Sequence, residues 1–257
     1  MSGTIHFRRE GEHVAVLEID NPPRNTLGTA MRAKLREHLG ALVADFSVRA
    51  VVLTGRGKAF CSGDDLREEL EAAAGGGERG ANLVDFGRLL DQVESFRTPV
   101  IAAINGWSVG GGVELALCCD LRLASTDAKF VCAGVNVGLA ASAYRLPRLI
   151  GMANAKHMLF TGLPYEAETV ARFGLVTEVH GTEDLLPAAL RIAERIATRA
   201  PLSVEATKRL ANSAADLTPD EALAAQAREL SALIASADHV TAISAFLEKR
   251  TLVFTRS

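Results

Sequence analysis

Three glycines and a glutamate fall within five positions of one another near the middle of the chain. Gly110, Gly111 and Gly112 follow an apolar, β-rich run, Val100–Ile104, and Glu114 comes two residues after them. Glycine lets a ligand approach the backbone closely, and a helix start adds unpaired N–H groups at the positive end of its dipole. Such a turn suits an oxygen that gains negative charge, beside a carboxylate that can move a proton. The segment therefore predicts a catalytic site.

Four further segments are informative when they are taken together with Arg97–Phe130. Ala50–Leu66 is a strand-like run that leads into a Cys-Ser-Gly-Asp-Asp loop, and three later blocks are Thr161–Val179, Pro201–Arg209 and Ala245–Val253. In this order and spacing, the five blocks resemble the enoyl-CoA hydratase/isomerase (crotonase) family from about residue 21 to residue 254. The resemblance implies acyl-CoA chemistry through a thioester enolate.

The order of expected elements predicts an α/β fold. A hairpin, a helix, a buried strand and two more helices are expected at Thr4–Arg9 with Val14–Asp20, Thr29–Asp45, Arg49–Thr54, Asp65–Ala74 and Asn82–Phe96. Strands that alternate with helices imply right-handed crossovers. Periodicity alone leaves a doubly wound sheet open, whereas the resemblance implies a crotonase-like spiral of ββα units. The glycine-rich stretch Ala72–Ala81 suggests a mobile loop.

The pattern changes near residue 183, from where apolar residues recur every three to four positions and no strand is expected. We expect a crotonase-like core with the CoA-thioester site at residues 1–197 and a C-terminal helical region at residues 198–257. The resemblance implies that these helices mediate trimer formation, and that trimers often pair into hexamers.

The resemblance also assigns roles at the site. The backbone N–H groups of Asp64 and Gly111 would form the oxyanion hole, and Glu114 corresponds to the first of two catalytic glutamates. A carboxylate beside a developing enolate would repel it, so the side chain of Asp64 must point away if its backbone donates there.

The second glutamate of the family is missing. Gly134 stands at its position after Phe130, and the segment Leu139–Pro147 is about three residues shorter than the family pattern. Hydration needs a base for water and an acid for the α-carbon. Glu114 would perform both steps in turn, or another group would help; some relatives with glycine here recruit a small anion. Asn136 and Tyr144 lie nearby in sequence, but a loop amide and a half-buried aromatic are the favoured interpretations.

Contacts to the substrate are expected from both loops and from an Arg-Asn-Thr-Leu segment that resembles the family's adenine-pocket segment. The expected CoA- and substrate-binding residues are Arg24, Asn25, Thr26, Leu27, Ser62, Gly63, Asp65, Leu66, Gly110, Gly112 and Gly134. Lys129 and Lys249 are weaker candidates for contacts to CoA phosphates, because most surface lysines are solvated.

A competing motif lies inside the glycine segment. Gly106–Gly110 matches G-x-S-x-G, the nucleophile elbow of α/β-hydrolases, and would make Ser108 a nucleophile. A triad would also need a downstream acid and histidine, which Asp127, Glu168, His180 and His239 supply in the right order. Because the surrounding blocks resemble another family, the hydrolase is a remote alternative.

Composition excludes several function classes. The chain has 257 residues, 48% of them hydrophobic and 23% charged, with a net charge of −3. These values give no reason to expect a nucleic acid or a membrane as a partner. No apolar run is long enough to span a bilayer and the N-terminus lacks a signal-peptide core, which favours a cytoplasmic location. Four cysteines and six histidines show no metal spacing, so we expect no metal.

Enoyl-CoA hydratase is therefore the leading interpretation, with CoA as part of the substrate and no separate cofactor. A double-bond isomerase is the nearest alternative. A protein that binds CoA thioesters with little or no turnover is the third.

Overall fold

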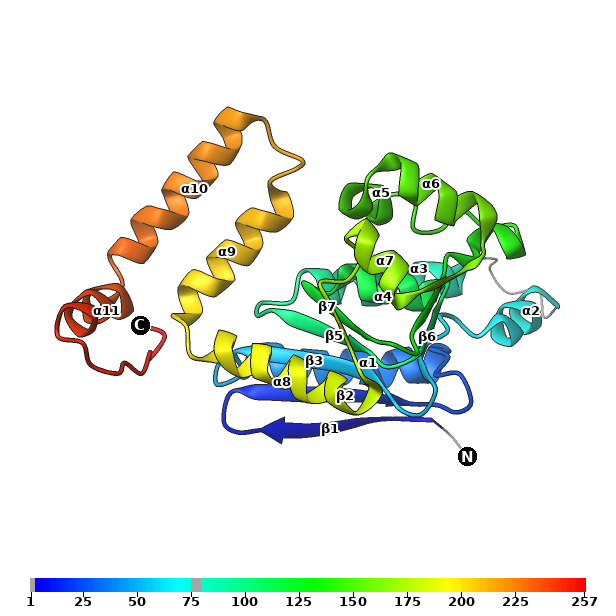
Figure 1. The fold of residues 1–257 in the computed structure, drawn as a ribbon, viewed down its shortest axis with the longest axis horizontal. Helices are drawn as coiled ribbons and strands as arrows, with labels where there is room; N and C mark the ends of the chain where they lie inside the picture. Colours follow the sequence, from blue (N-terminus) through cyan, green and yellow to red (C-terminus); the bar gives the residue numbers. More distant parts are fainter. Residues whose placement is uncertain (1–2, 75–79) are drawn as a thin grey trace.

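Two β-sheets and eleven α-helices make up the described part of the chain, residues 3–74 and 80–257 of a computed structural model (Figure 1). A six-stranded sheet has the order β1-β2-β3-β5-β7-β10, and a four-stranded sheet has the order β4-β6-β8-β9. The strands are β1 Thr4–Glu10, β2 Val14–Asp20, β3 Ala50–Gly55, β4 Ala59–Cys61, β5 Val100–Ile104, β6 Trp107–Val109, β7 Leu121–Ser125, β8 Lys129–Val131, β9 Pro164–Glu166 and β10 Glu178–His180.

The helices follow the strands along the chain. They are α1 Thr29–Ala44, α2 Leu66–Ala74, α3 Ala81–Glu94, α4 Gly111–Cys118, the 3-10 helix η1 Ala133–Val137, α5 Arg145–Ile150, α6 Met152–Thr161, α7 Ala167–Phe173, α8 Thr182–Ala197, α9 Pro201–Ser213, α10 Pro219–Ile234 and α11 Ala237–Leu247.

The two sheets are built by a repeated turn of the chain. Strands β3, β5 and β7 lie parallel in the large sheet, and each is followed by a short strand, β4, β6 or β8, in the small sheet. Helices then return the chain to the large sheet. This arrangement confirms the ββα spiral and excludes a single doubly wound sheet. The short strands escaped sequence analysis because three residues are too few to show a period of two.

Helices cover both faces of the large sheet. Along β3, Val51 and Leu53 belong to the core that includes α1 and α3, whereas Ala50 and Val52 belong to the core that includes α8. Alternate residues of a strand point to opposite faces, so one buried strand supports two helical layers. Fully burying each large aliphatic side chain contributes about 1.5–3 kcal/mol.

Helix α3 shows where the expected pattern holds and where it fails. Phe86, Leu89, Leu90 and Val93 are buried, but Leu83, which continues the same apolar spacing, is 44% exposed. Its neighbour Val84 is exposed too, because the first turn of α3 extends past the core. The predicted loop at Ala72–Ala81 lies partly outside the described residues; Ala72–Ala74 end α2 and Ala81 starts α3.

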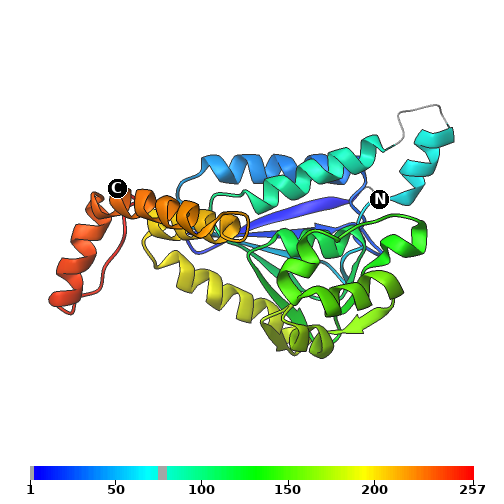
Figure 2. The same ribbon diagram turned by 90° about the horizontal axis from the view of Figure 1, so that it is seen from above.

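The last helices stand away from the sheets (Figures 1 and 2). Helix α10 has no buried residue, and α10 and α11 expose Leu223, Leu230, Ile234, Val240, Ile243, Phe246 and Leu247. Helix α8 ends at Ala197 and packs on the large sheet. The division into a core and a helical region remains a prediction. No single described helix is long and apolar enough to cross a bilayer, although the bent pair α10 and α11 passes that test by length and composition.

The C-terminal tail folds back onto these helices. The carboxylate of Asp238 in α11 accepts hydrogen bonds from the backbone N–H groups of Thr255 and Arg256, both 2.9 Å long. The guanidinium of Arg49, the residue directly before β3, donates to the carbonyl of Phe254 at 2.7 Å. These contacts tie the end of the chain to the spiral core.

Candidate active site

The two glycine loops predicted to form the site touch each other. Gly63 has a φ of +79°, and a Cβ added to it would lie 2.6 Å from the backbone nitrogen of Gly111. A Cβ added to Gly111 would lie 2.9 Å from the Cα of Gly63 and 2.8 Å from the ring of Phe86. No side chain fits at either position. Glycine at both positions is therefore what allows the backbones to meet.

This contact places two backbone donors near each other, the N–H of Asp64 and the N–H of Gly111. Gly111 is the first residue of α4, so its N–H has no carbonyl partner within the helix. Among the described residues, neither N–H donates a hydrogen bond to another group. Two unused donors beside a helix N-terminus are suited to stabilise an anionic oxygen.

The side chain of Asp64 points away from this position. Its carboxylate forms an ion pair with Arg32 and accepts a hydrogen bond from the N–H of Asp65 at 2.9 Å. Burial raises the pKa of the Asp64 carboxyl above its ordinary value, and the Arg32 guanidinium opposes that rise. The carboxylate is thus neutralised by a cation, which removes the conflict between an aspartate and an oxyanion hole.

Arg32 itself was not predicted from the sequence. Its side chain is fully buried and also binds Asp85 at 2.8 Å and the carbonyl of Leu27 at 2.9 Å. The sequence held one indication that Arg32 is buried: Arg32 follows Met31 on a helix whose apolar face is buried. Breaking a buried ion pair from one side costs about 3–5 kcal/mol, so Arg32 is expected to fix this loop firmly.

Glu114 lies one helical turn after Gly111, and only 9% of it is exposed. An Nη atom of Arg145, the first residue of α5, lies 3.5 Å from its Oε2 atom. It shares α4 with Gly111, and its role as the catalytic base remains a prediction. The importance of Arg145 was also missed, because nothing in the sequence relates it to a residue 31 positions earlier.

Helix η1 forms a second wall beside the glycine loop, because a Cβ added to Gly110 would lie 3.8 Å from the Cβ of Ala133. Gly134 lies in η1, and a Cβ added to it would come 2.7 Å from the carbonyl oxygen of Leu139 and 3.1 Å from the nitrogen of Ala141. A larger residue at this position would have to move the backbone of 139–141, so this packing favours glycine. That a second catalytic glutamate is missing here remains a prediction.

Two nearby polar residues serve structural purposes. The amide of Asn136 donates to the carbonyl of Gly162 at 3.0 Å, which agrees with the loop-amide interpretation. Tyr144 is 59% exposed and stacks against the guanidinium of Arg148, so the expectation that it is half-buried is wrong.

The Arg-Asn-Thr-Leu segment needs a correction. Asn25 is buried, and its side-chain amide donates to the carbonyls of Arg56 at 3.0 Å and Ala59 at 2.7 Å. Leu27 is buried as well and its N–H donates to the carbonyl of Gly63. These two side chains shape the loop from inside and are not presented to a ligand, because their groups are used within the protein.

The other expected binding residues divide by exposure. Arg24 and Leu66 are exposed, Thr26, Ser62, Asp65, Gly110 and Gly134 are partly exposed, and Gly63 and Gly112 are buried. A Cβ at Gly112 would lie 1.9 Å from the carbonyl oxygen of Cys61, so this glycine is needed for packing. The hydroxyl of Ser62 donates to the carbonyl of Arg24 at 2.7 Å, which joins the two segments. Contact of the accessible residues with CoA remains a prediction.

The hydrolase alternative is wrong. Ser108 lies within β6, is fully buried, and its hydroxyl has no hydrogen-bond partner among the described residues. Two of its four expected partners are occupied elsewhere: Asp127 accepts from Thr182 at 2.7 Å, and His180 contacts Glu178 at 2.7 Å. A nucleophile elbow must expose its serine, and this serine is enclosed.

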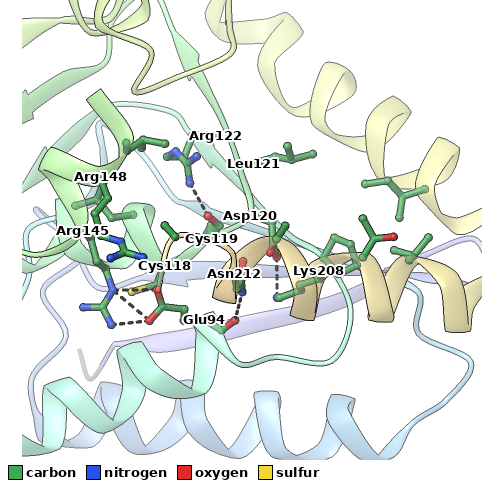
Figure 3. Close-up of a pocket in the computed structure, with 18 of the residues that line it drawn as sticks. Glu94, Cys118, Cys119, Asp120, Leu121, Arg122, Arg145, Arg148, Lys208 and Asn212 are labelled. Atoms are coloured by element: carbon green, nitrogen blue, oxygen red, sulfur yellow. Dashed lines mark hydrogen bonds and ion pairs between the residues drawn. The ribbon is translucent and has the colours of Figure 1, made fainter. Parts of the chain in front are cut away.

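A cavity of about 710 Å³ lies at the other end of α4 (Figure 3). It is bounded by Leu117, Cys118 and Cys119, by Arg145 and Arg148 of α5, and by residues of α9 that include Lys208. Glu114 does not line it. The described residues contain no group of three His, Cys, Asp or Glu side chains that could hold a metal ion.

Comparisons with known proteins agree with this fold. The family model described as enoyl-CoA hydratase/isomerase matches residues 9–257. A short-chain-enoyl-CoA hydratase of Clostridium acetobutylicum is 34% identical over 251 residues, which cover 96% of this chain and 95% of that protein. A crotonyl-CoA hydratase of Syntrophomonas wolfei is 36% identical over 93% of each chain.

A solved structure shows the same likeness in three dimensions. The crystal structure of an enoyl-CoA hydratase from Bacillus anthracis superimposes with a TM-score of 0.92 at 30% identity, covering 99% of this chain and 100% of that one. The chain belongs to the enoyl-CoA hydratase/isomerase family.

Proposed function

We propose that the protein hydrates 2-enoyl-CoA thioesters to 3-hydroxyacyl-CoA thioesters. The observation that carries this proposal is the close approach of Gly63 to Gly111, which brings the unused N–H groups of Asp64 and Gly111 near each other, one helical turn from Glu114. Relatives named as enoyl-CoA hydratases support it.

The proposed reaction uses Glu114 twice. Its carboxylate takes a proton from water while the water oxygen bonds to the β-carbon of the substrate. The electron pair of the double bond moves onto the thioester oxygen, and the resulting enolate is held by the N–H groups of Asp64 and Gly111. The protonated Glu114 then returns a proton to the α-carbon, and the thioester carbonyl re-forms. One water is added and the enzyme is regenerated, without a cofactor.

The expected magnitudes rank these contributions. Loss of one oxyanion-hole donor typically costs about 2.7–4 kcal/mol, and loss of a general base costs about a hundredfold to ten-thousandfold in rate. Both parts of the site are therefore needed for useful turnover. The thioester oxygen develops charge only in the enolate, so the amides act mainly on the transition state.

Double-bond isomerisation is a second candidate, and the absence of a carboxylate at Gly134 favours it. Moving a double bond from the 3- to the 2-position requires removal of one proton and its return at another carbon. A single carboxylate, Glu114, can carry that proton between the two carbons through the same enolate. Hydration and isomerisation thus share the anion site and differ in whether water is bound.

A substrate screen separates these candidates. The wild-type protein is offered 2-enoyl-CoA and 3-enoyl-CoA esters of short, medium and aromatic acyl groups, and products are identified by mass spectrometry. Hydration predicts a mass gain of one water from 2-enoyl esters. Isomerisation predicts products of unchanged mass from 3-enoyl esters only. Binding by calorimetry without either product would instead support a CoA-thioester-binding protein.

We also propose that the chain assembles as a trimer or a dimer of trimers. The support is the set of apolar side chains exposed on α10 and α11, which a single chain leaves uncovered. Light scattering at micromolar concentration is expected to give three or six times the monomer mass, and a stable monomer would contradict the proposal.

A further inference from the structure

Arg145 occupies a distinctive place between two glutamates. Its guanidinium donates to the carboxylate of Glu94 through Nε at 3.2 Å and through Nη2 at 2.7 Å. The remaining Nη1 atom lies 3.5 Å from Oε2 of Glu114. Figure 3 shows Arg145 reaching from α5 toward Glu94 of α3, next to Cys118 of α4. The guanidinium is therefore anchored on one side and faces the candidate base on the other.

The charged groups around Glu114 come from four segments. Helix α5 contributes Arg145, α3 contributes Glu94 and the more exposed Asp91, α4 itself contributes Cys118, and the segment before η1 contributes Cys132. Burial raises the pKa of both thiols, to about 12 for Cys132, so they are neutral near pH 7. In the described part of the chain, Arg145 is the one cation within 4.0 Å of Glu114.

The geometry leaves Glu114 free to react. The two short hydrogen bonds of Arg145 go to Glu94, whereas its contact with Glu114 is longer and mainly electrostatic. Because the guanidinium does not bind Glu114 tightly, the carboxylate oxygen can still accept a proton from water.

We propose that Arg145 is a positioning residue that holds the carboxylate of Glu114 in the orientation that the reaction needs. The inference rests on the proposed hydration. It assigns Glu94 a supporting part, since Glu94 fixes the plane of the guanidinium. It also gives the segment 139–147 a function, because that segment carries Arg145 at the start of α5.

A purely structural role would be the joining of α5 to α3, and Arg148 provides the matched control. Arg148 lies one turn further along α5 and forms a two-pronged ion pair with Asp216, at 2.7 and 2.9 Å. It also ties α5 to another segment, but it does not contact Glu114. Loss of packing or charge on α5 should affect the variants of both arginines. Loss of the contact with Glu114 should affect only the Arg145 variant.

The test compares Arg145→Met, Arg145→Lys and Arg148→Met with the wild type, after thermal unfolding has shown that each is folded. The kcat and KM for 2-enoyl-CoA hydration are measured for each protein. For Arg145→Met we expect kcat to fall about tenfold to a hundredfold, the usual scale for a misplaced catalytic group, with KM little changed. Arg145→Lys, which keeps the positive charge, should recover part of kcat, and Arg148→Met should keep the wild-type kcat and KM.

Three results would overturn the inference. An Arg145→Met variant with wild-type kcat would do so while leaving the proposed hydration intact. A kcat that falls equally in Arg145→Met and Arg148→Met would show that Arg145 is only structural. A wild-type protein that hydrates no 2-enoyl-CoA ester would remove the proposed function itself, and this inference with it.

Discussion

The two walls of the candidate site are built in different ways. On one wall, Gly63 and Gly111 bring two backbones together so closely that no side chain fits, and Glu114 follows in a buried helix. On the other wall, Gly134 lies in a 3-10 turn without buried residues, and Arg145 supplies the charge. We infer from this comparison that backbone packing fixes the proposed oxyanion site, whereas the proposed proton delivery depends on a few side chains.

The largest effect is expected from removing the carboxylate of the first wall. Glu114→Gln keeps the size and hydrogen bonding of the side chain but cannot take a proton at neutral pH. We expect turnover to fall about a hundredfold to ten-thousandfold, with thioester affinity by calorimetry nearly unchanged. Ser108→Ala is the control, since this enclosed hydroxyl has no role in the reaction and its loss should change little. An active Glu114→Gln would show that another group is the base.

The next largest effect is expected from adding a side chain where the two backbones of the first wall meet. In Gly63→Ala the new Cβ would lie 2.6 Å from the nitrogen of Gly111 at a φ of +79°, so the two amides must separate. We expect kcat to fall about a hundredfold, the scale for losing one oxyanion-hole donor, and the melting temperature to drop. Gly40→Ala, in the exposed part of α1 with no atom within 4 Å of the added Cβ, should be neutral or stabilising. Wild-type kcat in Gly63→Ala would mean that the loop contact is unimportant.

A smaller effect tests the second wall. Gly134→Glu adds a carboxylate where the resemblance implies one, but its Cβ would meet the carbonyl oxygen of Leu139 at 2.7 Å. We expect no gain in hydration and a loss of stability of about 1–3 kcal/mol, the usual cost of overpacking. Thermal unfolding and kcat are the measurements, with Val137→Glu, at an exposed position of the same turn, as a control for charge. A clear rise in kcat at unchanged stability would show that the 139–141 backbone yields easily.

The smallest effect concerns the rigidity of the two walls, which the rates of chemical modification of their cysteines compare. Burial raises the pKa of Cys61 and of Cys132 to about 12, so only about one thiol in ten thousand is ionised at pH 8. We expect both to react slowly with iodoacetamide. Cys132, which leads into the exposed turn, should be modified before Cys61, and peptide mapping by mass spectrometry reads the order. Earlier modification of Cys61 would reverse the comparison.

Local sequence was sufficient to identify the first wall. Gly111 and Glu114 are three positions apart on one helix, and a short pattern predicts their relation. Helices of strong periodicity such as α1 and the strands of the large sheet were also predictable. Each of these features is determined within a dozen residues of chain.

The remaining features depend on residues far apart in the chain. Arg32 meets Asp64 and Asp85, and Arg145 meets Glu94 and Glu114, across 31 to 53 positions. Asn25 was expected to bind the ligand because the sequence does not show that its amide donates to the backbone carbonyls of Arg56 and Ala59. Every residue has such a carbonyl, so no side chain marks these partners. Long-range pairs and backbone acceptors of this kind are not visible in a single sequence.

The central claim is that this site adds water to an enoyl thioester with one carboxylate. Its most direct test incubates the wild-type protein with 2-enoyl-CoA esters in oxygen-18-labelled water and analyses the products by mass spectrometry. We predict that at least one ester gives a 3-hydroxyacyl-CoA product that carries the heavy oxygen at the β-carbon. The Glu114→Gln variant should give no such product. Esters that bind but are recovered without label would contradict the claim.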